Sequence, residues 1–365
     1  MLLFLFAWSA LAASNPVFET GVPAPTKDKP QSKLWYAKGT WWAWMPEPGG
    51  SRLWRRSPNR WTPRDDLHSL LTGLPSQADV WASTDDIAAV LVEKNRIAFV
   101  RARFVTGNYV SQAKPVVFPL DAPTETATLA RDHAGRWWIA YNQLRRMWVR
   151  ASTDSSGNHW QPPVEVSAEP AADDDICAIT ALPNGIGVIW SDQAQDKVLF
   201  RVYDSHWNPV ETVDAGNKTA DDHFNIALGR NGVLFVATKN SLDMMDQPQL
   251  VLRVRDHAGR WTNHPYATRT PEAEPSRPIA VIGGDTLFLL HSVYRRRPPP
   301  GFIALLSTAT RAVRVGSAPT PLILPGPLPV NNVTGPKFPM PSDAPWIVLA
   351  SDDHGRVYEA ELPRP

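Results

Sequence analysis

The chain has a single cysteine, Cys177, among its 365 residues, so no disulfide can form within it. Cys177 lies in an apolar segment, and we expect it to be a buried small hydrophobe rather than a nucleophile. Excess charge is also missing. The formal net charge of +1 provides no electrostatic attraction to nucleic acid or to an anionic membrane.

Several common catalytic motifs are absent as well. The sequence contains no G-x-x-x-x-G-K-[ST] phosphate loop, no H-E-x-x-H metal motif, no C-x-x-C pair and no G-x-S-x-G elbow. No stretch after residue 30 keeps a helical period over three turns. In contrast, the chain has 36 prolines and 16 tryptophans. Because proline is excluded from helix interiors and central strands, so many prolines indicate many short connections between strands. We therefore predict an all-β protein.

The long apolar run at the start of the chain is confined to residues 1–13. Its length and its Ala-rich end predict a signal peptide, which is too short to span a membrane as a helix. No cysteine follows the run, which argues against a lipid anchor. We expect a secreted or periplasmic protein without stable membrane insertion, in which residues 14–365 form one domain.

A polar turn followed by tryptophan recurs along the chain. In its clearest copy, Ser152–Trp160, the order S-x-D-x-x-G-x-x-W includes Asp154, Gly157 and Trp160. Such an Asp can accept hydrogen bonds from turn amides, the Gly adopts angles that other residues resist, and the Trp wedges between two strands. Looser copies are found at 57–61, 203–207 and 256–261. Spacings near 50 residues indicate a structural repeat.

Two copies of a longer unit, 32–44 and 126–140, align residue by residue, and further copies start near residues 78, 175, 222, 277 and 331. Seven units of four strands predict a seven-bladed β-propeller. The last unit lacks an outer strand, which we expect residues 16–22 to supply, closing the ring and removing an exposed sheet edge. A six-bladed ring with residues 316–365 as an appendage is the alternative.

The tryptophan turn and the repeats make the chain resemble sialidase-like propellers (BNR, or Asp-box, repeat proteins). Three stretches, 29–35, 186–193 and 220–225, are similar to a group of secreted bacterial propellers of unknown function. Sialidases carry an Arg-Ile-Pro motif before their first Asp-box, and this sequence has none. The resemblance therefore implies the propeller fold, and it does not by itself indicate a function.

The innermost strands of a propeller begin at one mouth of the central channel, so equivalent positions in different repeats converge there. These positions are polar or charged in every repeat: Lys33, Asp79, Glu125, Asp175, His223, Arg277 and, less clearly, Lys337. As catalytic candidates we select Glu125, Asp175 and His223. Carboxylates crowded beside a histidine have pKa values that are shifted apart from one another, and acid–base chemistry requires such a difference. The ligand-binding candidates are Lys33, Asp79, Asp174, Asp222 and Arg277.

A purely structural reading of these charges remains open, because ion pairs around a channel also satisfy buried polar groups. We expect no cofactor, although calcium could bind at Asp173–Asp175. Consecutive strand residues point to opposite faces, so the three carboxylates cannot easily bind one ion. A solvated loop is therefore the simpler interpretation of these residues. The tryptophans at 41, 42, 44, 137 and 138 either stack on sugars or pack between blades, and packing is expected of residues on second strands.

Three functions follow. The first is binding of a glycan or a partner at the channel mouth. The second is a carbohydrate-active enzyme, either a glycoside hydrolase or a polysaccharide lyase, that uses the mouth residues. The third is a structural scaffold of the cell envelope. An enzyme requires an open mouth with acidic groups on either side of a bond, whereas a scaffold requires a plugged channel with paired charges. We expect a monomer that does not bind nucleic acid.

Overall fold

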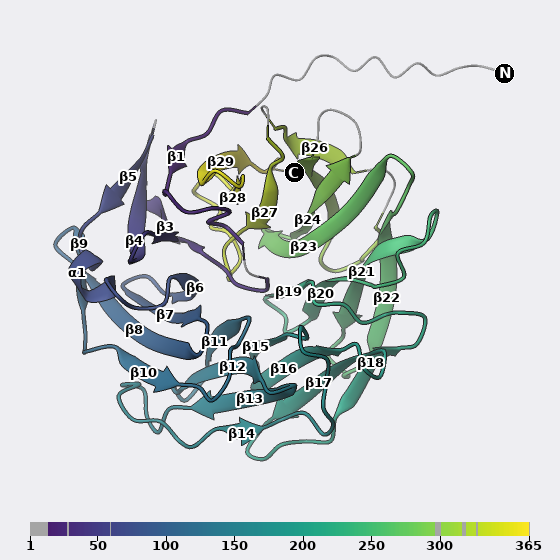
Figure 1. Ribbon diagram of the computed structural model, residues 1–365, viewed down its shortest axis with the longest axis horizontal. Helices are drawn as coiled ribbons and strands as arrows, with labels where there is room; N and C mark the ends of the chain where they lie inside the picture. The colour runs from purple at the N-terminus through teal and green to yellow at the C-terminus, as the bar shows by residue number, and fades with distance from the viewer. Residues whose placement is uncertain are drawn as a thin grey trace.

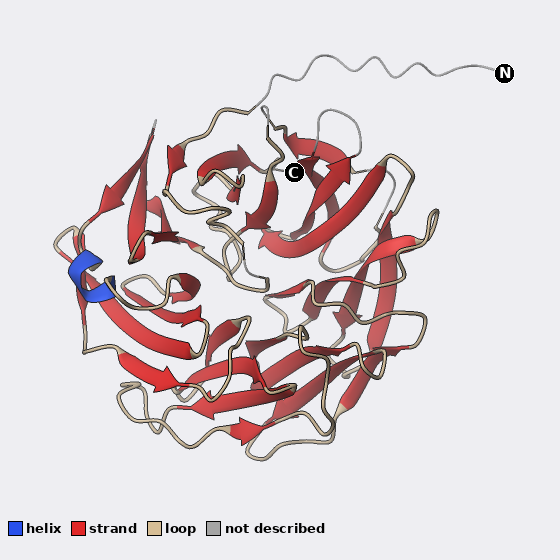
Figure 2. Cartoon of the chain, viewed as in Figure 1, coloured by secondary structure: helices blue, strands red, loops and turns tan. Residues whose placement is uncertain are grey.

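The computed structural model describes residues 14–27, 29–58, 60–295, 301–315, 319–325 and 328–364. Within these ranges the chain forms 29 β-strands and one short helix, α1 (His68–Leu71) (Figure 2). The strands make seven antiparallel sheets around a common axis (Figure 1). The predicted seven-bladed β-propeller is confirmed, and the six-bladed alternative is wrong. The predicted signal peptide, residues 1–13, lies outside the described ranges.

The first three blades run outward in chain order, from the innermost strand to the outermost. Blade 1 consists of β2 (Leu34–Ala37), β3 (Thr40–Glu47), β4 (Gly50–Ser57) and β5 (Arg60–Arg64). Blade 2 consists of β6 (Gln77–Ala82), β7 (Asp86–Glu93), β8 (Arg96–Val105) and β10 (Val116–Pro119), and the short β9 (Asn108–Ser111) also pairs with β8. Blade 3 consists of β11 (Ala127–Arg131), β12 (Trp137–Gln143), β13 (Arg146–Ala151) and β14 (Val164–Glu165).

The next three blades repeat this plan. Blade 4 consists of β15 (Cys177–Leu182), β16 (Gly185–Asp192), β17 (Lys197–Tyr203) and β18 (Glu211–Ala215). Blade 5 consists of β19 (Phe224–Leu228), β20 (Leu234–Lys239), β21 (Pro248–Arg255) and β22 (Trp261–Thr268). Blade 6 consists of β23 (Ala273–Gly283), β24 (Thr286–Arg295), β25 (Gly301–Ala309) and β26 (Thr320–Ile323).

Blade 7 joins the two ends of the described chain. Its strands are β27 (Asn331–Thr334), β28 (Ile347–Ser351), β29 (Arg356–Glu361) and, on the outside, β1 (Phe18–Glu19). Phe18 pairs with Val357 and Glu19 with Arg356, so the N-terminal segment supplies the outer strand as predicted. This pairing covers the backbone edge of β29, which would otherwise be open to another chain.

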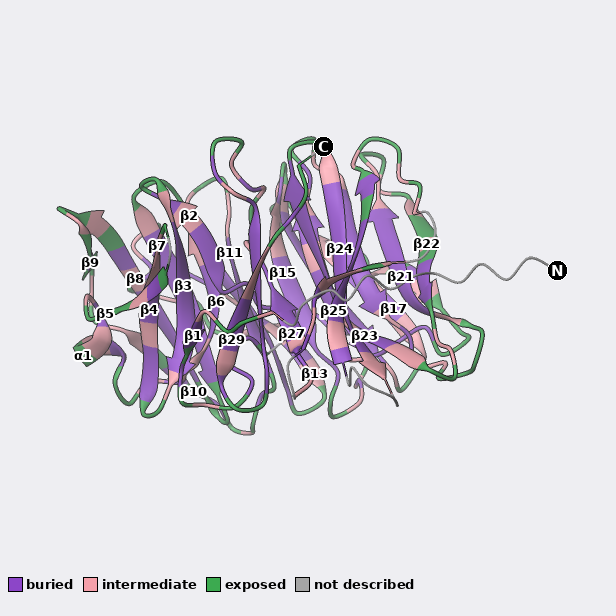
Figure 3. Cartoon of the chain, turned by 90° about the horizontal axis from the view of Figure 1, so that it is seen from above, coloured by how far each residue is buried: buried purple, intermediate pink, exposed green. Residues whose placement is uncertain are grey.

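The core lies between the blades rather than within any one sheet. Six clusters of buried apolar side chains fill the spaces between neighbouring blades in the described chain. Because each middle strand is covered on both faces, it is apolar along most of its length; all seven residues of β12 are buried. Figure 3 shows the buried residues concentrated in the strands and the exposed residues in the loops of both faces.

The five tryptophans considered as sugar platforms belong to this core. Trp41, Trp42 and Trp44 on β3 are at most 1% exposed, and Trp137 and Trp138 on β12 are 2% and 4% exposed. They pack between blades, as the interpretation from second-strand positions predicted. Cys177 is also fully buried, and this burial raises the pKa of its thiol, so it is an inert core residue as expected.

The recurring tryptophan turn lies between the third and fourth strands of its blades. In blade 3, the Asp154 carboxylate accepts a hydrogen bond from the Ser156 amide at 2.7 Å, and the Trp160 indole donates to the Gly157 carbonyl at 2.8 Å. Gly157 has φ +62°, and a Cβ there would lie 2.5 Å from the Phe99 ring. Only glycine fits such a position without displacing its neighbours.

Hydrogen bonds from side chains link the innermost strands around the channel. Asp79 on β6 accepts from the Leu129 amide of β11 at 2.7 Å, and Thr128 on β11 accepts from the Ile179 amide of β15 at 3.0 Å. Asn225 on β19 likewise accepts from the Ala280 amide of β23 at 3.1 Å. Each innermost strand has a free backbone edge, and these contacts satisfy amides that would otherwise be buried without partners. Polar residues at the channel therefore have a structural task in this fold.

The closure of the ring leads to a first prediction. The Phe18 ring stacks on Trp54 of blade 1 with centroids 4.3 Å apart, and it also contacts Trp61. Phe18→Ala should lower the free energy of unfolding by about 3 kcal/mol, because it removes a buried aromatic ring and leaves a cavity. Urea unfolding measures this loss, with the exposed Val105→Ala as a control expected within about 0.5 kcal/mol of wild type. A loss below about 1 kcal/mol for Phe18→Ala would show that β1 does not lock the ring.

A second prediction concerns His291 on β24, which is fully buried. Neither of its ring nitrogens has a hydrogen-bond partner among the described residues, and burial lowers its pKa to about 3. The unfolded chain, with an ordinary histidine pKa near 6.5, binds the proton first as the pH falls. Stability is therefore complete above about pH 6.5 and is lost progressively down to about pH 3.

Between pH 7 and pH 4.5 this residue alone should reduce the free energy of unfolding by about 2 to 3 kcal/mol. Urea unfolding at a series of pH values measures the slope, and His291→Phe should flatten it. An unchanged slope in the variant would exclude His291 as its source.

Candidate functional site

The predicted ring residues lie mostly where the innermost strands begin, on what we call the upper face. Lys33 and His223 directly precede β2 and β19, and Glu125 and Asp175 stand two residues before β11 and β15. Asp79 is the third residue of β6. The radial repeat therefore brings residues from blades 1 to 5 to one end of the channel.

Two of the seven positions depart from this pattern. Arg277 lies inside β23 at a register shift between Ser276 and Ile279, with φ +53°. Lys337 lies three residues beyond the end of β27, so its predicted equivalence to the strand starts is wrong; Asn331 begins that strand. The seventh inner strand has the weakest apolar pattern, which explains the shifted alignment. Lys337 approaches the channel from the opposite, lower face.

The upper mouth is crossed by residues 29–31 of the segment between β1 and β2. Figure 1 shows this purple segment running in toward the centre of the ring. The side-chain amide of Gln31 donates to the Ala127 carbonyl of blade 3 at 3.0 Å, and the Pro30 carbonyl accepts from the side-chain amide of Asn225 of blade 5 at 3.2 Å. The segment therefore bridges blades on different sides of the channel, which the repeat alignment did not predict.

Lys29 brings this segment to the charged residues. Its ammonium contacts the Asp222 carboxylate closely and lies 3.6 Å from Glu125 Oε1. The Glu125 side chain is 39% exposed, whereas the side chains of Lys29 and Asp222 are 13% and 21% exposed. Two carboxylates from blades 3 and 5 thus share one cation at the mouth.

His223 is held by two carboxylates. Its Nδ1 lies 2.8 Å from Asp221 Oδ1 and 2.5 Å from Asp222 Oδ1, so Nδ1 carries a hydrogen that it donates to them. Nε2 is covered from solvent and has no hydrogen-bond partner among the described residues. When the imidazole is neutral, this nitrogen therefore carries a lone pair. The arrangement fixes the orientation of the ring and leaves one nitrogen available for proton transfer.

The charges around His223 are balanced by two lysines. Asp221 accepts from Lys239 at 2.6 Å and from Ser241 at 3.0 Å. Burial alone would raise the pKa of Asp222, but the hydrogen bond and charge of His223 and the ammonium of Lys29 outweigh it and hold that pKa well below its usual range. Asp222 is therefore an anion at any ordinary working pH.

The run Asp173–Asp175 does not gather around one point. Asp173 is 94% exposed, and Asp174 accepts from the Gln193 side chain at 3.0 Å. Asp175 is fully buried and accepts from the amides of Ala172 and Gln193 at 2.7 and 2.9 Å. These contacts make Asp175 an anchor of its own loop, at the edge of the charged mouth.

In the described part of the chain, the group that could supply three close metal ligands is Asp221, Asp222 and His223, whose ligand atoms lie within 4.8 Å of one another. Lys29 and Lys239 already neutralise the two carboxylates, and Nδ1 is bonded to both. This donor set therefore suits a hydrogen-bonded histidine better than a divalent cation, which would have to compete with two ammonium groups.

Asp79 and Lys33 lie deeper and are both fully buried. Asp79 accepts from the Ser32 amide at 2.8 Å and pairs closely with the Lys337 ammonium. The Lys33 ammonium donates to Gln31 at 3.0 Å and to the Ala78 carbonyl at 3.2 Å. These two predicted ligand-binding residues thus join the innermost strands to each other.

The sixth blade brings a second polar group to the upper face. Arg277 donates from Nε to the Tyr294 hydroxyl at 3.0 Å, and Asn331 of blade 7 also donates to that hydroxyl. Sequence reasoning missed Tyr294 and Lys29, because neither occupies the repeated position. Asp221 was also missed, although the next two residues, Asp222 and His223, were selected.

No family model matches the chain, and no curated protein is similar to it. Solved structures do share its fold. The α-L-arabinanase of Penicillium chrysogenum, solved with arabinobiose, has a TM-score of 0.51 at 13% identity, over 83% of this chain and 99% of that one. The polysaccharide lyase Uly1 has a TM-score of 0.50 at 9% identity, covering 98% and 93%. A Lactobacillus plantarum protein reaches 0.51 at 16% identity, covering 91% and 87%. At these identities the likeness concerns the fold alone.

Proposed function

We propose that this propeller is a carbohydrate-active enzyme that acts on a glycan at the upper mouth of its channel. The observation that carries the proposal is the state of His223: two carboxylates orient the ring through Nδ1, and Nε2 is left without a partner among the described residues. A histidine oriented in this way is suited to take or give a proton. Glu125 is the second acid–base group, and Asp175 anchors the adjoining loop.

The fold comparisons support this choice over simple binding. Two propellers of similar architecture are named for action on glycans, one as an arabinanase bound to arabinobiose and one as a polysaccharide lyase. Fold alone does not transfer an activity. Together with a histidine held by carboxylates at the mouth, it favours carbohydrate chemistry over the other reactions that a propeller can host.

The charges favour an acidic glycan as substrate. The Lys29 ammonium and the Arg277 guanidinium lie on the same face as His223, and either can neutralise a uronate carboxylate. Such neutralisation makes the neighbouring carbon acid, so that a base can remove its proton while the glycosidic oxygen leaves and a double bond forms. A polysaccharide lyase is therefore the first reaction class to test, and a glycoside hydrolase that uses Glu125 with Asp222 is the second.

Access to His223 requires a movement of the N-terminal segment. Lys29 contacts Asp222, the residue before His223, and Pro30 contacts Asn225, two residues after His223. Residues 29–31 therefore cover the start of β19. We infer that the substrate displaces this segment. The carboxylate of the substrate then pairs with Lys29 in place of the protein carboxylates that pair with it now.

A structural ring is the second candidate, and one specific observation favours it. The charges at the mouth pair among themselves, Lys29 with Asp222 and Glu125 and Lys239 with Asp221, while residues 29–31 cross the channel. Pairing of this kind is what a scaffold needs. In that case the mouth residues would affect stability alone.

The direct test is a degradation screen. The purified protein is incubated with neutral and uronate-containing polysaccharides, and products are followed by new reducing ends and by the ultraviolet absorbance of a conjugated double bond. The proposal expects cleavage of at least one acidic polysaccharide. Turnover of none, together with a large loss of stability in Lys29→Ala, would favour the structural ring.

The proposal also includes the family relationship and the cellular location of the protein. A sialidase-like (BNR) relationship is supported by the polar turn at Ser152–Trp160, in which Asp154 accepts from the Ser156 amide and Trp160 donates to the Gly157 carbonyl. Export to the periplasm or the exterior is supported by the apolar run at residues 1–13. In the described part of the chain, no helix is long and apolar enough to cross a membrane.

A further inference from the structure

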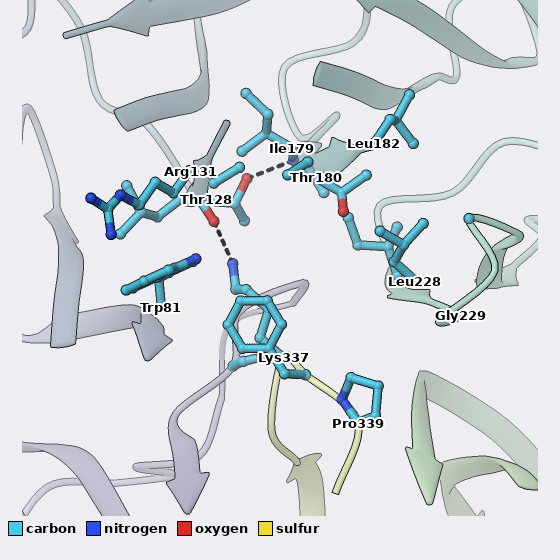
Figure 4. A pocket seen from close by; sticks show the side chains of 18 of the residues that line it. Trp81, Thr128, Arg131, Ile179, Thr180, Leu182, Leu228, Gly229, Lys337 and Pro339 are labelled. Carbon is cyan, nitrogen blue, oxygen red and sulfur yellow. Dashed lines mark hydrogen bonds between the residues drawn. The ribbon is translucent and has the colours of Figure 1, made fainter. Parts of the chain in front are cut away.

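The lower half of the channel contains a cavity of about 460 Å³ that the chemistry at the upper mouth does not use. Pro30 and Ser32, from the segment between β1 and β2, are among the residues that line it. Its sides come from the ends of β6, β11, β15 and β19 and from residues 337–339 (Figure 4). A volume of this size suits a small organic ligand.

The walls are mainly apolar. Ile226 and Leu228 line the cavity from blade 5, and Figure 4 shows Leu182 and Leu228 on the side opposite Trp81. At the rim, Trp81 and Phe338 form an edge-to-face pair with centroids 6.0 Å apart, and Phe338 remains 43% exposed. Sugar hydroxyls would lose their hydrogen bonds to water against such walls, so a glycan does not suit this cavity.

The charged residues of the cavity are all of one sign. Arg131, Arg230 and Lys337 are the charged residues that line it, the histidine His133 also lines it, and no described lining residue is acidic. Lys337 is neutralised by Asp79, and His133 contacts the Leu182 carbonyl at 3.1 Å. Arg131 and Arg230 therefore set the charge of the opening.

The two arginines differ in mobility. Arg131 lies over the rings of Trp81 and Trp137, at 5.2 and 4.8 Å from their centroids, and donates to the Gly135 carbonyl at 3.1 Å. Its guanidinium is thus held between blades 2 and 3, and Figure 4 shows it directed away from the cavity. Arg230 is exposed on the turn after β19 and can swing toward a ligand.

We propose that this cavity binds a small amphiphilic carboxylate, with the apolar body inside the channel and the carboxylate at Arg230. The apolar walls take up the hydrocarbon, and the Arg230 guanidinium pairs with the charge at the edge, where water still screens part of the cost of desolvation. Charge complementarity thus selects an anion over a cation with the same body.

Isothermal titration of the whole protein with decanoate tests the proposal. Binding should tighten about three- to fourfold for each methylene from hexanoate to decanoate, because each buried methylene contributes a fixed increment of transfer free energy. Decyltrimethylammonium, which carries the opposite charge, should bind at least tenfold more weakly. Equal affinity for the cationic and anionic amphiphiles would overturn the proposal.

Two variants locate the site. Arg230→Glu should weaken decanoate binding by about tenfold or more, because it reverses one charge at the rim. Arg311→Glu, at an exposed turn of blade 6 with its side chain 80% exposed, is the matched control and should leave binding unchanged. Leu228→Trp should weaken binding, because the larger side chain takes up part of the cavity. If decanoate binds Arg230→Glu as it binds wild type, or binds neither, the cavity is not the site of an amphiphilic carboxylate.

Discussion

Replacing His223 with alanine is expected to slow turnover of the acidic polysaccharide found in the screen by about 100- to 10,000-fold, the usual contribution of a general acid–base group. The variant removes the ring whose Nδ1 is held by Asp221 and Asp222 and whose Nε2 is available for the proton. The surrounding charges stay paired, because Lys29 still contacts Asp222 and Lys239 still contacts Asp221. The loss should therefore appear in kcat, while the thermal midpoint changes little.

The matched control is His206→Ala, because the His206 side chain is 75% exposed on a turn of blade 4 and contacts its local neighbours Ser205, at 3.3 Å, and Asp204, at 3.5 Å. It should keep full activity. Asp222→Asn should retain the fold but lose part of the rate, since it weakens the orientation of the ring. Wild-type turnover by His223→Ala would remove this residue from the chemistry. Asp175→Ala is a further contrast, because its carboxylate is bonded to loop amides and its loss should lower stability first.

Replacing Asp79 with alanine is expected to lower the free energy of unfolding by about 3 to 5 kcal/mol. The carboxylate is fully buried and accepts from Ser32 of the crossing segment, from Leu129 of blade 3 and from Lys337 below blade 7. Its removal leaves two amides without an acceptor and the Lys337 ammonium without its counter-ion, although that ammonium still donates to the Leu129 carbonyl at 2.7 Å. Urea unfolding measures the loss.

Asp79→Ala combined with Lys337→Met should recover part of that loss, because the second change removes the unpaired charge that the first creates. Asp173→Ala is the surface control, since Asp173 is 94% exposed and its change should stay within about 0.5 kcal/mol. If Asp79→Ala costs less than about 1 kcal/mol, the channel charges do not hold the ring together.

The sequence was sufficient for the architecture because the propeller is a repeat. Apolar second strands recur in every unit and tryptophan turns recur in blades 1, 3, 4 and 5, and the missing outer strand of the last unit predicted that β1 would supply it. The buried positions of Trp41 and Trp138 followed from the same pattern, since second strands are covered on both faces.

The same reasoning placed the starts of most inner strands correctly and misplaced Lys337. The seventh inner strand, β27, has only four residues, and its apolar pattern is too short to fix the register. A slip of a few residues in such an alignment moves a side chain from one end of the channel to the other. Lys337 nevertheless contacts Asp79, because a lysine side chain is long enough to reach into the channel.

Residues outside the repeat could not be predicted by comparing repeats. Lys29 lies in a proline-containing leader, and nothing in the leader's composition shows that it crosses the channel. Two of the stretches that resemble secreted bacterial propellers, 29–35 and 220–225, prove to be in contact through Lys29 and Asp222. The lower cavity depends on how the ends of four inner strands and residues 337–339 pack, which only the folded structure reveals.

The most direct measurement is a crystal structure of His223→Ala bound to an oligosaccharide of the polysaccharide that the wild-type protein degrades. We predict the sugar at the upper mouth, with residues 29–31 displaced, a carboxylate of the sugar on Lys29 or Arg277, and the vacated imidazole position facing the ring carbon that loses its proton. An oligosaccharide bound in the lower cavity or on the outer strands, with residues 29–31 still across the mouth, would contradict the assignment of catalysis to the charged end of the channel.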